Sequence, residues 1–205
     1  MNVAYLEDIP MNGSLIIVSG QSGAGKTSIV EGAIERLGIG KRVITCTSRH
    51  PREKEMDGID YHFLPRALFH ELIDRSEFAE YAEVYGNLYG TLKRDIASAC
   101  EEHSLCYIIT DVQGAGTLTQ LYPQAHSIFI TLPAKKDLEE RLRKRGDSDA
   151  SIEKRLQSFY FEQEEGIFFD SIIMNKNDDL SNSITEFIAQ VRAYHAADTT
   201  KDVQL

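Results

Sequence analysis

The chain has 205 residues, of which 42% are apolar and 26% are charged, which is ordinary for one compact globular domain. Its formal net charge of −10 argues against a nucleic-acid-binding protein, because a phosphate backbone needs a broad basic surface. No apolar run approaches the roughly 18 residues that would predict a membrane span, so we expect neither nucleic-acid nor membrane partners.

The chain start and the cysteines indicate the compartment. The first residues include Glu7 and Asp8 and have neither the basic start nor the apolar block of a secretory signal. The three cysteines, Cys46, Cys100 and Cys106, have no CxxC or metal-ligand spacing, so we expect reduced thiols with a structural role. A cytoplasmic protein is the resulting prediction.

Apolar runs predict the elements in chain order. The strands expected from apolar runs are 15–18, 43–46, 61–64, 105–109, 127–132 and 171–174, with hairpin-like structure over 80–90. The helices expected from periodicity are 26–37, 67–74, 92–102, 138–144, 152–165 and 184–194. Continuous apolar strands that alternate with helices predict an α/β fold, with a parallel sheet covered on both faces.

The first strand runs into a glycine-rich loop. The pattern G-x-x-x-x-G-K-[ST] is matched by Gly20-Gln21-Ser22-Gly23-Ala24-Gly25-Lys26-Thr27. Such a loop points successive backbone N–H groups at one phosphate, at the positive end of the following helix. The alternative is a glycine-rich connection that binds nothing, but the strand before it and the helix after it favour a nucleoside triphosphate site. The residues expected to bind this nucleotide are Gly20, Ser22, Gly23, Ala24, Gly25, Lys26, Thr27 and Ser28.

Two side chains of the phosphate loop and one beyond it suit phosphoryl transfer. Lys26 would reach the β- and γ-phosphates, and the Thr27 hydroxyl would ligate Mg²⁺. Asp111 follows the strand 105–109, where a carboxylate could hold the metal or orient Lys26. An Asp after a strand is more often a turn residue; beside a phosphate loop we assign it to the site.

Several further segments resemble the guanylate kinase family. They are Thr45-Cys46-Thr47-Ser48-Arg49-His50-Pro51-Arg52, Asp57-Gly58-Ile59-Asp60-Tyr61, Glu80-Tyr81-Ala82, Gly86-Asn87-Leu88-Tyr89-Gly90-Thr91 and Asp111-Val112-Gln113-Gly114. Together with the phosphate loop they lie in family order from about Ser14 to Asp179. The resemblance implies a P-loop core over 1–45, 92–137 and 156–195, a GMP-binding insertion over 46–91, a lid over 138–155 and a flexible tail over 196–205.

The resemblance also implies the acceptor site. Arg49, Arg52, Tyr61 and Tyr89 would hold the GMP phosphate, and Thr45, Glu80 and Thr91 would face guanine. The chemistry agrees, since two guanidinium groups can grip a phosphate dianion with paired hydrogen bonds. One carboxylate can accept both N1–H and N2–H₂ of guanine, whereas adenine would leave it unpaired.

A second basic cluster lies in the predicted lid. The family likeness assigns Arg141, Arg145 and Arg155 to the closure over the triphosphate, where cations neutralise the charge of the transferring phosphoryl group. Arg143 and Lys144 are expected to be solvated surface residues. For the adenine, the family places an asparagine after the last core strand; both Asn175 and Asn177 could match, and we assign Asn177.

The chain departs from the family at a few positions. Family members usually carry an acidic residue where this chain has Ile109, and a proline where it has Gln21. They often have an aromatic residue at the position of Leu88 and tryptophan at that of Tyr81, and the lid between Gly146 and Ser151 is about one residue short. The change at Ile109 removes a charged acceptor for the guanine amino group, so IMP should compete better here.

The expected function is Mg²⁺-dependent transfer of the ATP γ-phosphate to GMP, giving ADP and GDP, with dGMP or IMP as further acceptors to test. One alternative is a non-catalytic guanylate-kinase-like binding module, although such modules typically lose the loop lysine or glycines. Another is a P-loop kinase for a different nucleoside monophosphate. Composition and motifs leave the oligomeric state open.

Overall fold

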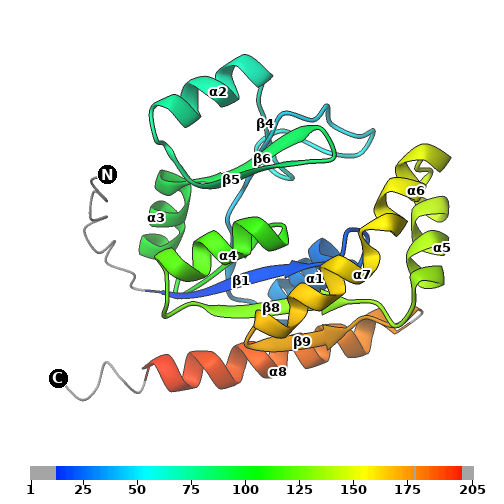
Figure 1. Cartoon of the computed structure of the whole chain (residues 1–205). Helices are drawn as coiled ribbons and strands as arrows, with labels where there is room; N and C mark the ends of the chain where they lie inside the picture. Colours follow the sequence, from blue (N-terminus) through cyan, green and yellow to red (C-terminus); the bar gives the residue numbers. More distant parts are fainter. Residues whose placement is uncertain (1–12, 178, 200–205) are drawn as a thin grey trace.

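The computed structural model describes residues 13–177 and 179–199, the last four by their backbone alone, and shows a layered α/β core with a smaller sheet above it (Figure 1). Five parallel strands form the core sheet in the order β2-β7-β1-β8-β9. Their bounds are β1 Ser14–Gly20, β2 Lys41–Arg42, β7 Leu105–Ile109, β8 His126–Thr131 and β9 Ser171–Met174. The predicted parallel sheet is therefore confirmed.

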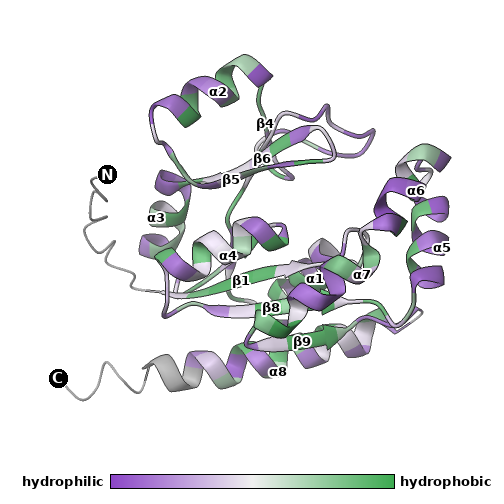
Figure 2. Ribbon diagram, in the orientation of Figure 1, coloured by the Kyte–Doolittle hydropathy of each residue, from purple (hydrophilic) through white to green (hydrophobic). Residues whose placement is uncertain are grey.

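Helices cover both faces of this sheet, because consecutive strand side chains point to opposite sides. On β1, Ile16 and Val18 pack into the core formed with α1 (Lys26–Leu37) and α8 (Leu180–Thr199). Leu15 and Ile17 pack into the opposite core, formed with α3 (Lys93–Glu102) and α4 (Val112–Leu121). The strands are hydrophobic and the outward helix faces are hydrophilic (Figure 2).

The insertion has a sheet and a core of its own. The four strands have the order β4-β3-β6-β5, and their bounds are β3 Cys46–Thr47, β4 His62–Phe63, β5 Phe78–Val84 and β6 Asn87–Leu92. The rings of Phe69, on α2 (Arg66–Asp74), and Phe78 stack with centroids 4.4 Å apart. The predicted β5–β6 hairpin is confirmed.

The predicted strand over 43–46 is wrong, because the chain changes sheets there. Lys41 and Arg42 pair with β7 in the core sheet, whereas Cys46 and Thr47 pair within the insertion. Between them, the Val43 N–H still donates to the Tyr107 carbonyl. An apolar run can thus cross from one sheet to another without forming one strand.

Helices α5 (Lys135–Arg145), α6 (Asp149–Gln157) and α7 (Phe159–Glu165) lie away from α3, toward the right of the core in Figure 1, and the 3₁₀ turn η1 (Gly166–Phe168) follows them. The single helix predicted over 152–165 is divided at Ser158. The Ser158 hydroxyl lies 3.1 Å from the Arg155 carbonyl and 2.8 Å from Glu162 Oε1, so it competes with regular helix bonding. Helix α4 was not predicted, since Gly114 and Gly116 weaken its helical pattern.

Other chain-wide expectations have mixed outcomes. All three cysteines are free and buried, as expected. Helix α8 continues to Thr199, four residues into the predicted tail, while 200–205, Asp178 and the acidic start lie outside the described residues. Within the described part of the chain, no helix has the length and apolarity to cross a membrane.

Candidate active site

A cavity of about 600 Å³ lies between the phosphate loop, the insertion and the lid helices. The predicted site residues that line it are Gly20, Ser22, Gly23, Gly25, Lys26, Thr27, Ser28, Thr45, Arg49, Arg52, Tyr61, Glu80, Tyr89, Asp111, Arg145 and Arg155. Ile109 also lines it. Four predicted site residues stand outside this lining: Ala24, Thr91, Arg141 and Asn177. The fold thus brings residues from 20–28, 45–61, 80–89 and 109–111 to one space.

The phosphate loop curls because its glycines adopt backbone angles that other residues avoid. Gly23 and Gly25 have φ near +92° and +91°. A Cβ at Gly20 would lie 2.0 Å from the Ile130 carbonyl oxygen, so the loop also packs too closely on β8 for a side chain. No side chain caps the first turn of α1, which begins at Lys26. Its N–H groups are therefore available to an anion.

Gln21 anchors this loop from below. Its side chain is buried, and its amide nitrogen donates to the Phe159 carbonyl at 3.0 Å. The amide oxygen accepts from the Leu132 N–H at 2.8 Å and from the Thr131 hydroxyl at 3.0 Å. The departure from proline therefore replaces a rigid residue with three hydrogen bonds, which the sequence alone did not predict.

Lys26 is folded back onto its own loop. Its Nζ donates to the carbonyl oxygens of Gly20, at 2.7 Å, and Gln21, at 3.1 Å. Burial lowers the pKa of Lys26 to about 8, while the nearby carboxylates of Glu162 and Asp111 partly offset that effect. A phosphate in the loop would raise this pKa again and so favour the charged form of the lysine.

Asp111 has a structural role and a spare oxygen. Its Oδ1 accepts from the N–H groups of Gln113, at 2.8 Å, and Gly114, at 3.1 Å, and so caps α4. Oδ2 makes no such cap bond, and the carboxylate faces the same cavity as Thr27. One carboxylate and one hydroxyl, supplemented by phosphate and water oxygens, suit the hard oxygen ligation of Mg²⁺.

On the acceptor side, Arg49 and Arg52 share a carboxylate that sequence reasoning missed. Arg49 holds Glu55 in a two-pronged pair, with distances of 2.8 and 2.9 Å. The Arg52 N–H donates to Glu55 at 2.8 Å, and its guanidinium lies 3.3 Å away. The Arg52–Glu55 spacing of three residues was the available signal. Glu55 therefore fixes both guanidinium groups in one place.

Two tyrosines complete this cluster. Tyr61 and Tyr89 have ring centroids 6.2 Å apart in an edge-to-face arrangement. The Arg49 guanidinium lies 5.6 Å from the Tyr61 ring. Its Nε is buried without a hydrogen-bond partner of good geometry among the described residues. The cluster thus presents a guanidinium group and two phenols to an anion.

Glu80 is the buried carboxyl of the insertion. It is 3% exposed, and its Oε1 accepts from the Thr91 hydroxyl at 2.5 Å. Oε2 has no well-oriented partner among the described residues, although Thr110 is near enough to lower the pKa slightly. Burial dominates and raises the pKa of Glu80 to about 7. Thr91 therefore contacts Glu80 rather than the cavity, which differs from the expected contact with guanine.

Gly114 makes room for Glu80. A Cβ at this position would lie 2.4 Å from Glu80 Oε2 and 2.3 Å from the Thr110 hydroxyl. Both distances are shorter than any normal contact, so the close approach of α4 to the carboxyl requires glycine. This explains why glycine is needed at position 114, the last residue of the motif Asp111-Val112-Gln113-Gly114.

The three lid arginines have different surroundings. Arg145 pairs with Asp147 at 2.5 and 2.8 Å, and Arg155 donates to the Ser22 hydroxyl of the phosphate loop. Arg141 differs from the expectation that it closes over the triphosphate, because it donates to the carbonyls of Ala24, at 3.0 Å, and Asn175, at 2.9 Å. It therefore supports the loop from outside the cavity.

The two candidate asparagines are both tied to this outer side. Asn175 is buried and donates to the Ala24 carbonyl at 2.6 Å. Asn177 accepts from Arg141 Nε at 2.8 Å and donates to Asp137 at 3.0 Å. Neither lines the cavity. Asn175 contacts the phosphate loop directly at Ala24, and Asn177 is linked to it through Arg141.

Comparisons with known proteins identify the family of the chain. The guanylate kinase family model matches residues 12–194. The chain is 41% identical to a guanylate kinase of Aromatoleum aromaticum over 188 residues, which covers 89% of each chain. It is 40% identical to a guanylate kinase of Vibrio cholerae over 184 residues, with 88% of each chain covered. A guanylate kinase structure from Anaplasma phagocytophilum shares the fold, with a TM-score of 0.73 at 24% identity, over 89% of this chain and 86% of that one. The chain belongs to the guanylate kinase family.

Proposed function

We propose that this chain transfers the γ-phosphate of ATP to GMP and releases ADP and GDP. The observation that carries the proposal is one cavity with two anion sites of different construction. One is the backbone loop at Lys26, and the other is the Arg49–Arg52 pair with the buried carboxyl of Glu80 nearby. A kinase that transfers a phosphoryl group from one nucleotide to another needs both sites.

The reaction requires no protein nucleophile. An oxygen of the GMP phosphate attacks the γ-phosphorus of ATP, and the bond to the ADP oxygen breaks. Arg49 and Arg52 would hold the attacking phosphate, and Lys26, Arg145 and Arg155 would neutralise charge on the transferring group. Mg²⁺, held by Thr27 and Asp111 with the phosphates, would screen the same charge.

Guanine recognition rests on Glu80. Its carboxylate would accept N1–H and N2–H₂, and the Thr45 hydroxyl lines the cavity as a donor for O6. Thr91 orients Glu80 through their hydrogen bond. AMP would leave the buried carboxylate without donors, which is costly.

Two other functions deserve comparison. A binding module without activity is disfavoured because Lys26 and both acceptor arginines are present. A kinase for another monophosphate gains support only from Ile109, which supplies no charge to the guanine amino group.

A coupled ADP-release assay with ATP, Mg²⁺ and each of GMP, dGMP, IMP and AMP tests the proposal. We expect the highest kcat/KM with GMP, none with AMP, and loss of turnover when the metal is chelated. Lys26→Ala should lower kcat by at least about a hundredfold, whereas Lys144→Ala, at an exposed lid position, should match the wild type. Absence of turnover with all four acceptors would overturn the proposal.

A further inference from the structure

The tip of the β5–β6 hairpin has an unusual backbone. Its two turn residues, Tyr85 and Gly86, have φ of +52° and +84°, between the paired residues Val84 and Asn87. Such turns favour Asn or Asp before glycine, because a bulky side chain with positive φ is strained. A tyrosine here needs contacts that offset the strain.

Those contacts come from the other side of the cavity. The Tyr85 hydroxyl lies 2.7 Å from the Ser158 hydroxyl and donates to Glu162 Oε1 at 3.1 Å. The Arg155 guanidinium and the Lys154 ammonium lie 5.0 and 5.4 Å from the centroid of its ring. Both the ring and the hydroxyl of Tyr85 are thus bound by residues of α6, α7 and the bend between them.

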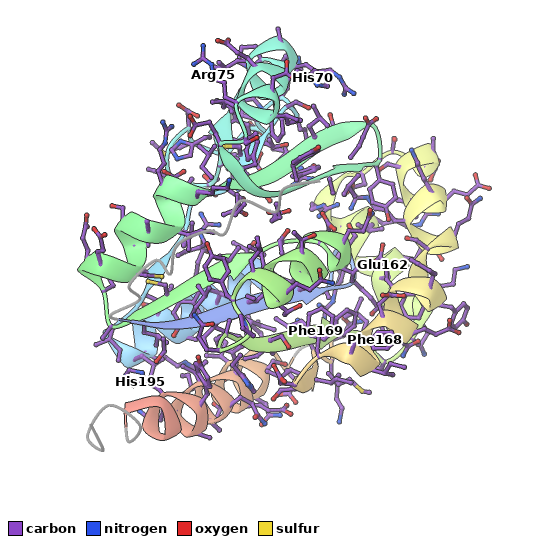
Figure 3. The ribbon with its side chains drawn as sticks, turned by 60° about the vertical axis from the view of Figure 1, so that its left-hand side comes forward. His70, Arg75, Glu162, Phe168, Phe169 and His195 are labelled. Carbon is purple, nitrogen blue, oxygen red and sulfur yellow. The ribbon has the colours of Figure 1, made fainter. Side chains whose placement is uncertain are left out.

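The same carboxylate continues to the phosphate loop. Glu162, on α7 and labelled in Figure 3, accepts from the Ser22 N–H through Oε2 at 3.0 Å. Arg155 provides a second link, since it donates to the Ser22 hydroxyl. Tyr85, Glu162 and Ser22 therefore form a continuous bridge from the insertion tip to the donor loop.

The bridge holds the end of the hairpin that lies away from the core. At the base of the hairpin, Ala79 packs into the core beneath α3 and α4. At the opposite end, the Tyr85 contacts join the tip to the far wall of the cavity. The acceptor residues Glu80 and Tyr89 lie on the two strands between these points.

We propose that Tyr85 and Glu162 are positioning residues, which hold the insertion tip against the donor side of the cavity. This inference rests on the proposed function. Because the bridge favours the arrangement in which the insertion faces the donor side, GMP binding in that arrangement loses less conformational entropy. The bridge should therefore act on GMP affinity and leave ADP affinity unchanged when only Tyr85 is altered.

Tyr85→Phe removes the hydroxyl and keeps the ring. We expect the KM for GMP to rise roughly fivefold, the scale of one lost hydrogen bond. The kcat, and the Kd of ADP measured by calorimetry, should change less than about twofold. Tyr81→Phe is the matched control, since Tyr81 lies on the same hairpin with its side chain exposed, and it should match the wild type.

Tyr85→Asn distinguishes the effect of losing the bridge from an effect on the stability of the hairpin. Asparagine suits the turn better, so the hairpin should remain folded, yet all contacts with Ser158, Glu162 and the two cations are lost. We expect the KM for GMP to rise by roughly tenfold or more. Combined with Glu162→Gln, Tyr85→Phe should add less than its separate effect, because both changes break one bridge.

Hydrogen–deuterium exchange in nucleotide-free protein gives a readout without turnover. Amides of residues 78–92 should exchange faster in Tyr85→Phe and Tyr85→Asn than in Tyr81→Phe. The bridge proposal is overturned if both Tyr85 variants match the control in exchange and in KM, or if ADP and GMP affinities fall equally. Absence of wild-type turnover would overturn the proposed function, and exchange would still decide on the bridge.

Discussion

The donor and acceptor halves of the cavity bury charges of opposite sign. In the donor half, burial lowers the pKa of Lys26 to about 8; in the acceptor half, it raises the pKa of Glu80 to about 7. The cause is the same, since loss of water disfavours the charged form of either group. Each half thus contains one group that its nucleotide would have to hold in the charged state.

The halves also differ in what holds the ligand. The donor loop presents backbone N–H groups from consecutive residues, so its geometry follows from glycine positions. The acceptor half uses side chains from separate strands, with Arg49 ordered by Glu55 and Glu80 by Thr91. A substitution in the acceptor half should therefore weaken GMP binding without affecting ADP binding.

Arg49→Ala should give the largest difference between the effects on GMP and on ADP. It removes the buried guanidinium that pairs with Glu55 and leaves that carboxylate where the phosphate would bind. Loss of one partner in such a site costs about 2–5 kcal/mol, so kcat/KM for GMP should fall by about a hundredfold or more.

In the same variant, the Kd of ADP should stay within about twofold by calorimetry. Arg143→Ala is the control, because Arg143 pairs with Glu139 and Asp149 on the exposed side of the lid. An equal loss of ADP and GMP affinity would contradict separate halves.

Gly114→Ala should have a smaller effect, again confined to GMP. The added Cβ overlaps Glu80 and Thr110, so the carboxyl must shift. We expect a roughly tenfold rise in the KM for GMP and a loss of about 1–3 kcal/mol in the free energy of unfolding. Gly116→Ala, on the same helix with no atom within 4 Å of the new Cβ, should be neutral or stabilising by up to about 1 kcal/mol. Similar behaviour of the two variants would refute the Glu80 contact.

The smallest predicted effect is at Ile109. Ile109→Asp should raise the ratio of kcat/KM for GMP over IMP roughly fivefold, because it adds a charged acceptor for the amino group. Ile109→Asn is the control, because asparagine has the size of aspartate but no charge. It distinguishes the effect of the charge from the effect of losing the packing of Ile109 against the core. An unchanged ratio in Ile109→Asp would mean that Ile109 does not face this amine.

The phosphate loop could be predicted from local spacing, whereas several contacts elsewhere in the site could not. Gly20 to Thr27 are contiguous, and their spacing alone implies the loop. Tyr85 and Glu162 escaped prediction because their contact depends on tertiary placement, since they are 77 residues apart. Glu55 was missed although its partners Arg49 and Arg52 lie only six and three residues away. Likewise, the break at Ser158 and helix α4 depend on side-chain bonds to Glu162 and Asp111, which periodicity does not detect.

Which apolar side chains are exposed also could not be predicted from the sequence. Ile167 and Phe168 resemble core residues in sequence, yet both are more than 70% exposed, and Figure 3 labels Phe168 beside Phe169. Phe169 instead packs against Phe129, with ring centroids 5.1 Å apart. Adjacent phenylalanines in an irregular segment thus differ, since Phe168 is exposed and Phe169 is partly buried.

The most direct test of the two-half account is calorimetric binding of ADP and GMP between pH 6 and 9. ADP would bind charged Lys26, so its affinity should fall as pH rises above about 8, by up to about tenfold per pH unit. GMP would bind ionised Glu80, so its affinity should fall as pH drops below about 7, with the same limiting slope.

The terminal phosphates of both nucleotides also gain a proton at about pH 6. The ADP trend is therefore compared above about pH 7, and Glu80→Gln isolates the phosphate contribution for GMP. The account predicts opposite pH trends for the two nucleotides, with the GMP trend reduced to that of the phosphate in Glu80→Gln. Trends of the same sign, or an unchanged GMP trend in Glu80→Gln, would contradict it.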